Sequence, residues 1–171
     1  MQIRSSHFPG DRPSCPVDPH HAIDRHGRYA RHANCDDQQK EAVDRFLCRP
    51  CGRTISVLPD HFLPYRAVSV PFVQKHFDAQ ANPGPALEPP ATEKEKGCLK
   101  RAWDRFGQRV AALATVLGQM MQIRFRNPKP CWLALRRWGN LPDILHQLAQ
   151  PFNTSLLHDY LCLRPWLRRP D

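Results

Sequence analysis

The sequence has no long apolar run. Its longest nearly apolar stretch, VAALATVLG at 110–118, is far shorter than the roughly 20 residues that a membrane-spanning helix needs. The first residues, MQIRSSHFPGDRP, lack the apolar segment of a secretory signal and meet proline at once. We therefore expect a cytoplasmic protein that does not enter a membrane.

Glycine and acidic residues are also scarce. Eight glycines stand against 18 prolines, which indicates short elements and stiff connections rather than one long regular sheet. Asp and Glu number 16 against 25 Lys and Arg, a net charge of +9. The excess is uneven, because residues 98–171 hold 12 basic and 4 acidic residues. Such an asymmetry favours a phosphate-rich partner, since Lys and Arg displace condensed counterions from nucleic acid.

The carboxylates that phosphodiester chemistry needs are missing as well. That chemistry gathers acidic side chains around two metal ions, but residues 98–171 offer only Asp104, Asp143, Asp159 and Asp171 and no strand pattern to carry them. We therefore predict that the protein is not an enzyme. A small metal-dependent enzyme remains an alternative, which would require a metal ion with one open coordination position.

Four segments follow one another along the chain. Residues 1–66 are loop-rich, with short apolar runs that suit small strands. Residues 67–80 predict a short helix with Ser69 as N-cap and Pro71 in the first turn. Residues 81–91 (ANPGPALEPPA) have the composition of a Pro-rich linker.

Residues 92–171 are predicted to form a basic, mostly helical domain. Thr92 and Glu95 match a capping box. Apolar residues then recur at three- and four-residue steps and predict one amphipathic helix of about eight turns: Leu99, Trp103, Phe106, Val110, Leu113, Leu117, Met120 and Met121. The segment NPKP at 127–130 ends this helix, and shorter helices are predicted over 131–138, 142–149 and 154–162. The fold class is therefore α+β, a small N-terminal β unit followed by helices.

Cysteine spacing indicates a metal site in the β unit. Seven cysteines in a reducing compartment favour metal ligands and buried thiols over a disulfide framework. In RFLCRPCGRT (45–54), Cys48 and Cys51 precede Gly52, where the chain must turn tightly. This pair is typical of one half of a zinc ribbon, in which tetrahedral Zn²⁺ takes two ligands from each of two turns.

The other half of the site is incomplete. In SCPVDPHH (14–21), Cys15 opens a comparable turn, but Asp18 stands where a second cysteine is expected. Imidazole binds zinc better than one carboxylate beside thiolates, so His20 is favoured over Asp18 as the fourth ligand. His21 and Cys35 remain further candidates.

The order of these residues resembles the zinc-ribbon domain at the N-termini of bacterial insertion-sequence transposases and their companion proteins. The resemblance covers CP…RHGRYAR…VDRFLCRPCGRTISVLPDHFLPYR at 15–66, and Asp18 departs from the family's Cys-Pro-x-Cys turn. In that family helices of helix-turn-helix character follow, often with a Trp-x-x-Arg-Phe stretch, and WDRF at 103–106 is similar. The resemblance implies a structural zinc ion, DNA binding and a link to a mobile element.

We therefore expect a non-enzymatic zinc-ribbon protein that binds nucleic acid, DNA rather than RNA, as an accessory or remnant protein of a transposable element. The residues predicted to contact phosphates are Arg28, Arg31, Arg49, Arg53, Lys100, Arg101, Arg105 and Arg109. The alternative is an interaction adaptor that binds a transposase, a recombinase or another partner through the ribbon and the apolar stripe of 99–121.

Overall fold

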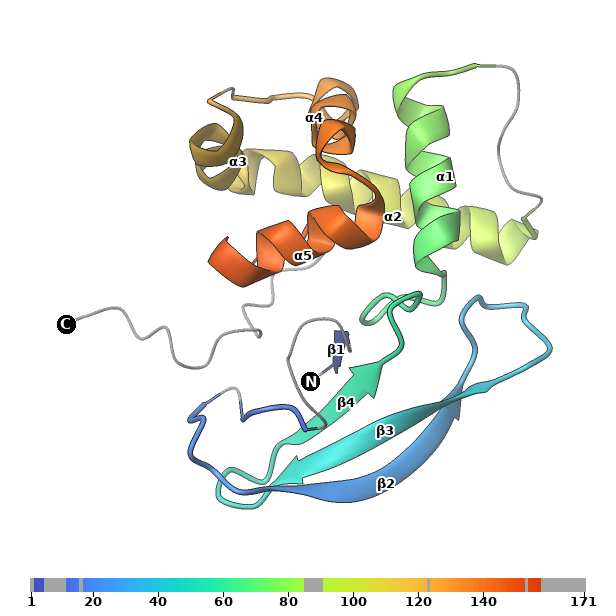
Figure 1. Cartoon of the computed structure of the whole chain (residues 1–171). Coiled ribbons are helices and arrows are strands. Elements are labelled where there is room, and N and C mark those ends of the chain that lie inside the picture. The colour runs from blue at the N-terminus through green and yellow to red at the C-terminus, as the bar shows by residue number, and fades with distance from the viewer. Residues whose placement is uncertain are drawn as a thin grey trace.

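A small sheet and a layer of helices make up the fold, and Figure 1 shows the helices above the sheet. The computed structural model describes residues 2–4, 12–15, 17–84, 91–122, 124–152 and 154–157. The sheet comes first in the chain and the helices follow, so the α+β prediction is confirmed.

The sheet has the strand order β1-β4-β3-β2. Strands β2 (Ile23–Arg31), β3 (Glu41–Cys48) and β4 (Thr54–Leu58) are antiparallel, while the short β1 (Gln2–Arg4) runs parallel to β4. The apolar cluster of this unit is small: Ala33, Val43, Leu58 and Phe62, with Tyr29 packed against them. Phe46 and Ile55, which pair across β3 and β4, are buried as well. A unit of this size still buries little apolar surface and would gain from a second source of stability.

The helical layer consists of α1 (Val70–Ala81), α2 (Glu93–Ala112), α3 (Ala114–Met121), α4 (Pro128–Leu135) and α5 (Leu141–Phe152), with a 3₁₀ turn, η2, at Arg136–Trp138. The N-cap Ser69 and Pro71 in the first turn of α1 are as predicted. The capping box is confirmed, because the Glu95 N–H donates to Thr92 Oγ1 over 3.3 Å and the Thr92 N–H donates to Glu95 Oε2 over 3.0 Å.

The prediction of a single eight-turn helix is wrong. The chain turns at Leu113, which separates α2 from α3, and Figure 1 shows α3 at an angle to α2. Leu113 and Leu117 are both buried in one core, so the turn lets α3 fold over that core instead of extending away from it. The prediction that NPKP ends a helix is also wrong: α3 already ends at Met121, and Asn127 caps the start of α4 by accepting the Lys129 N–H over 3.0 Å. Of the predicted helix over 154–162, residues 154–157 are not helical and the rest lie outside the described residues.

An aromatic core holds α1, α2 and α4 together. The Phe77 ring lies 5.0 Å from Trp103, 5.4 Å from Phe106 and 5.1 Å from Trp132, measured between ring centroids. The helix predicted over 67–80 is thus part of the helical layer and not a separate segment; of the predicted linker, 85–90 lie outside the described residues. The apolar stripe from Leu99 to Leu117 faces this core, which removes it as a surface for a partner.

Polar contacts attach the sheet to the helices. Arg31 at the end of β2 donates to the carbonyl oxygen of Leu63 over 3.0 Å and also to that of Arg66. The backbone N–H of Ser69 donates to Asn34 Oδ1 over 2.7 Å. Among the described residues no helix is both long and apolar enough to cross a membrane.

Truncation of the central ring tests the aromatic core. We expect Phe77→Ala to lower the free energy of unfolding by about 3–5 kcal/mol, because a buried phenyl ring leaves a cavity. Leu133→Ala is the control: Leu133 is 48% exposed, and its truncation should change the free energy by less than about 0.5 kcal/mol. Urea unfolding followed by tryptophan fluorescence measures both, and equal effects would contradict this account of the core.

Candidate metal centre

Two turns meet at one end of the sheet. Ile23 at the start of β2 pairs with Cys48 at the end of β3, and the Arg49 N–H donates to the carbonyl oxygen of Ala22 over 3.2 Å. The second turn closes when the Cys48 N–H donates to the carbonyl oxygen of Arg53 over 2.9 Å. Gly52 has φ +63° there, a left-handed conformation that favours glycine. Strand pairing therefore places the residues just before Ile23 opposite the Cys-x-x-Cys turn.

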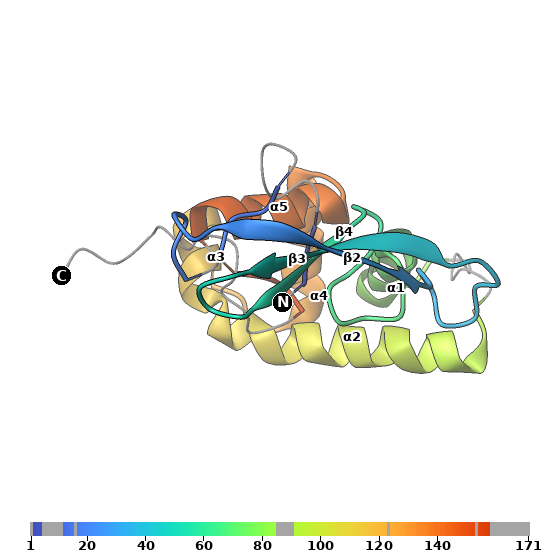
Figure 2. The ribbon, with the colours of Figure 1, turned by 90° about the horizontal axis from the view of Figure 1, so that it is seen from below.

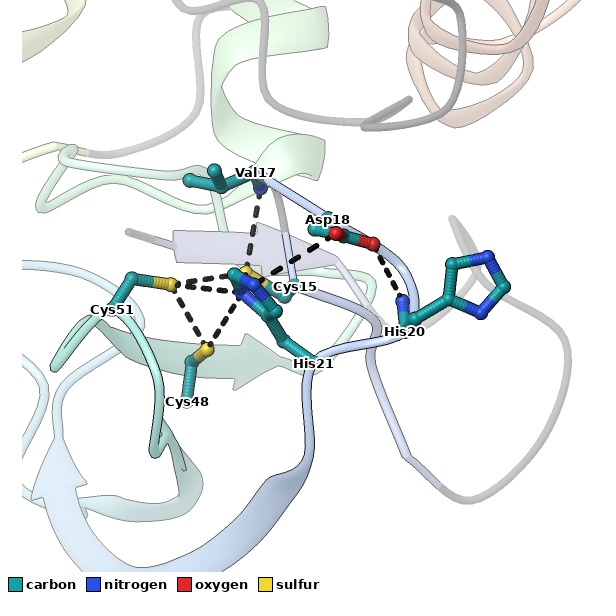
Figure 3. A network of polar contacts seen from close by, with 7 residues as sticks. All are labelled: Cys15, Val17, Asp18, His20, His21, Cys48 and Cys51. Atoms are coloured by element: carbon teal, nitrogen blue, oxygen red, sulfur yellow. Dashed lines mark hydrogen bonds and ion pairs between the residues drawn. The ribbon is translucent and has the colours of Figure 1, made fainter.

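Three thiols and one imidazole gather between these turns, as Figure 3 shows. The Cys51 sulfur lies 3.3 Å from that of Cys15 and 2.9 Å from that of Cys48. The His21 Nδ1 atom lies 3.4–3.6 Å from all three sulfurs. The four ligand atoms are within 4.8 Å of one another and can hold a metal ion.

The distances suit tetrahedral coordination. Metal–sulfur bonds of about 2.3 Å and metal–nitrogen bonds of about 2.0 Å give tetrahedron edges of about 3.5 Å between sulfur and nitrogen and about 3.8 Å between sulfurs. The sulfur–nitrogen distances match the first value, whereas the sulfur–sulfur distances of 3.3 and 2.9 Å are shorter than the second. Four protein donors would complete a tetrahedral shell, as in structural sites, and would leave no open position.

The histidine that lies beside the three thiols is not the one that the sequence favoured. Cys15, Cys48 and Cys51 come together as predicted, but His21 and not His20 completes the group. Figure 3 shows the His20 ring pointing away from the sulfurs. His21 lies two residues before Ile23, whose strand partner is Cys48, so the pairing brings this part of the chain close to the Cys-x-x-Cys turn. That pairing register is the signal that would have selected His21, and the sequence alone does not reveal it.

Asp18 also lies outside the four ligands. Its Oδ1 atom accepts the His20 N–H over 2.9 Å, and its Oδ2 atom lies 3.8 Å from His21 Nε2. A carboxylate behind a ligating imidazole orients the ring and raises its basicity. Asp18 thus lies beside the group, near the outer nitrogen of His21, and is not one of the four gathered side chains. Cys35, the remaining candidate, belongs to a loop at the opposite end of the sheet.

Hydrogen bonds decide where the charge of the group lies. Burial raises the pKa of Cys15, but the backbone N–H groups of Asp18 and Val17 and the neighbouring thiols donate to its sulfur and lower that pKa to about 6. The hydrogen bond with Cys48, burial and the charge at Cys15 raise the pKa of Cys51 to about 12. One thiolate is therefore ready at neutral pH, and a divalent cation would displace the proton of Cys51 on binding.

Six of the eight predicted phosphate-binding residues lie at the surface, and they fall into two groups. Arg53, Lys100 and Arg101 are exposed, and Arg105 is half-buried on the same helix as the last two. Arg28 and Arg49 are exposed too, but Arg28 donates to Asp44 over 2.6 Å and Arg49 to Asp24 over 2.5 Å.

The structure does not support the prediction that Arg31 and Arg109 contact phosphates. Arg31 binds backbone carbonyls beneath the sheet, as described above. Arg109 is 7% exposed and donates to the Ser155 carbonyl oxygen over 2.9 Å and to Thr154 Oγ1 over 3.2 Å. Both guanidinium groups connect elements inside the protein, so they are not available to a polyanion.

A sheet closed at one end by three thiols and an imidazole defines an α+β protein with a candidate structural metal site. The chain belongs to the family described as Domain of unknown function (DUF6431), whose model matches residues 13–101. The match includes all four candidate ligands, the whole of α1 and the first half of α2. No curated protein and no solved structure matches the chain.

Two adjacent histidines give a matched test of this centre. We expect His21→Ala to weaken Co²⁺ binding by at least about 100-fold, because it removes a ligand, and His20→Ala to leave the affinity unchanged. Asp18→Asn should weaken binding by about 10–100-fold through the orientation of His21. Titration followed by the visible absorption of tetrahedral cobalt–thiolate complexes measures each affinity. Loss of binding in His20→Ala with retention in His21→Ala would contradict the assignment.

Proposed function

We propose that the protein is a non-enzymatic zinc-ribbon DNA-binding protein, an accessory or remnant protein of a transposable element. The observation that carries this proposal is the closed group of Cys15, His21, Cys48 and Cys51 at the end of a small sheet. Three thiolates and one imidazole are the donors of structural zinc sites. The zinc ion would bind the two turns together and supply the stability that the small apolar cluster does not.

The ligand set also supports a structural rather than a catalytic role for the metal. With four protein donors in place, zinc has no position for water or substrate. Asp18, which would have permitted an open site as a weak fourth ligand, instead faces His21 from outside the group. The metal-dependent enzyme is therefore the less favoured reading.

Exposed basic side chains support nucleic acid as the partner. Lys100 and Arg101 are exposed on α2, and Arg53 is exposed beside the metal turn. The start of α4 adds exposed Arg124, Arg126 and Lys129. The resemblance of residues 15–66 to the transposase ribbon favours DNA over RNA.

Salt dependence of binding tests the DNA proposal. We expect affinity for duplex DNA to fall steeply with salt, because each neutralised phosphate adds about 0.9 to the slope of log K against log salt concentration. Lys100→Gln should lower that slope by about one unit. Lys75→Gln, at an exposed position of α1, is the control for loss of one positive charge and should leave the slope unchanged. Fluorescence anisotropy with a labelled duplex measures both, and affinity that does not change with salt would refute the proposal.

A further inference from the structure

Two cysteines from different parts of the fold face each other far from the metal centre. Cys35 lies in the loop that joins β2 to β3, and Cys98 lies on α2. Their sulfur atoms are 3.9 Å apart, and both are free, half-buried thiols. Figures 1 and 2 both show this loop beside the first turns of α2. The pair thus connects the sheet and the helices at the end of the sheet opposite the metal centre.

Neighbouring contacts hold the two cysteines in place. Asp36, next to Cys35, accepts a hydrogen bond from the Thr92 hydroxyl and lies 3.4 Å from Lys94 Nζ. Asn34, on the other side, accepts the Ser69 N–H over 2.7 Å. The loop is therefore attached to the N-terminal ends of both α1 and α2. A disulfide requires the sulfurs to approach to about 2.05 Å, a further movement of about 2 Å that side-chain rotation can supply.

The electrostatic environment gives the two thiols different roles. Arg101 Nη2 donates a hydrogen bond to the Cys98 sulfur over 3.1 Å, and cationic side chains are typical neighbours of cysteines that act as nucleophiles. Burial, together with the neighbouring Cys98, raises the pKa of Cys35 to about 11. Cys98 is therefore the thiol that attacks first, and Cys35 is the one that resolves the product.

We propose that Cys35 and Cys98 form a thiol–disulfide exchange site whose co-substrate is a low-molecular-weight disulfide such as oxidised glutathione. The Cys98 thiolate attacks one sulfur of that disulfide, which forms a mixed disulfide and releases one small thiolate. Cys35 then loses its proton, attacks the Cys98 sulfur and releases the second small thiol. The protein pair is oxidised by two electrons and the small disulfide is reduced to two thiols. The product is a covalent link between the sheet and α2.

The same neighbourhood is a poor metal site. Cys35, Asp36 and Glu95 also lie close enough to one another to hold an ion. However, Asp36 accepts the Thr92 hydroxyl and Glu95 accepts the Thr92 N–H in the capping box. Both carboxylates are thus committed to the start of α2, and the cation beside Cys98 is already Arg101. These contacts favour thiol exchange over metal binding.

Peptide mapping of the full-length protein tests the site. The metal-loaded protein is equilibrated with glutathione buffers of increasing oxidised fraction, alkylated and digested. We expect a linked peptide pair that joins Cys35 to Cys98. Cys131 is the internal control and should stay reduced, because it is fully buried and burial raises its pKa to about 12. A map in which Cys35 and Cys98 stay reduced, or pair with other cysteines, would overturn the proposal.

Variants at Cys35, Cys98 and Arg101 separate the roles of the two thiols. Cys35→Ser should accumulate glutathione on Cys98, whereas Cys98→Ser should leave Cys35 unmodified. Arg101→Met should slow the first step several-fold, and Arg101→Lys should restore part of the rate because it keeps the charge. Equal modification of Cys35 and Cys98 in the two serine variants would overturn the assignment of roles. The site shares Arg101 with the proposed DNA surface, but it contains no metal ligand and the peptide map is made without DNA. Its outcome is therefore independent of the proposed function.

Discussion

The convergence of Cys15, His21, Cys48 and Cys51 is the contact on which the rest of the structure depends. It joins the chain ahead of β2 to the turn between β3 and β4. Among the described residues, the apolar cluster of the sheet has four buried members, and Phe46 and Ile55 are a further buried pair on β3 and β4. A unit of that size gains little from burial. Metal coordination supplies that energy in small domains of this kind. The helical layer has its own aromatic core and no such requirement.

Several basic side chains form contacts within the protein, so not all of the positive charge is available to a partner. Arg31 and Arg109, which sequence composition assigns to a cationic surface, bind carbonyl oxygens inside the protein. Arg28 and Arg49 have carboxylate partners. Fewer of the 25 Lys and Arg side chains are therefore available to contact a polyanion than their number suggests. Among the described residues, the exposed basic side chains include Lys100 and Arg101 on α2, Arg124, Arg126 and Lys129 at the start of α4, and Arg53 beside the metal turn.

Many elements of the structure could be predicted from local signals in the sequence. The α+β fold, the capping box at Thr92, Ser69 and Pro71 at the start of α1, and the tight turn at Gly52 all depend on neighbouring residues, so the sequence predicts them. Three features depend on contacts between distant residues. The turn at Leu113 follows from packing of α3, since the apolar periodicity continues through it. The choice of His21 over His20 depends on the register of β2 against β3. The burial of Arg109 depends on residues 154–155, more than 40 positions away.

X-ray absorption spectroscopy of the purified metal-bound protein tests the central claim most directly. The account predicts zinc with a first shell of three sulfur atoms at about 2.3 Å and one imidazole nitrogen at about 2.0 Å. A shell with oxygen in the fourth position, or with two sulfur atoms instead of three, would contradict the closed structural site. A metal-free protein that keeps its sheet would contradict the account as a whole.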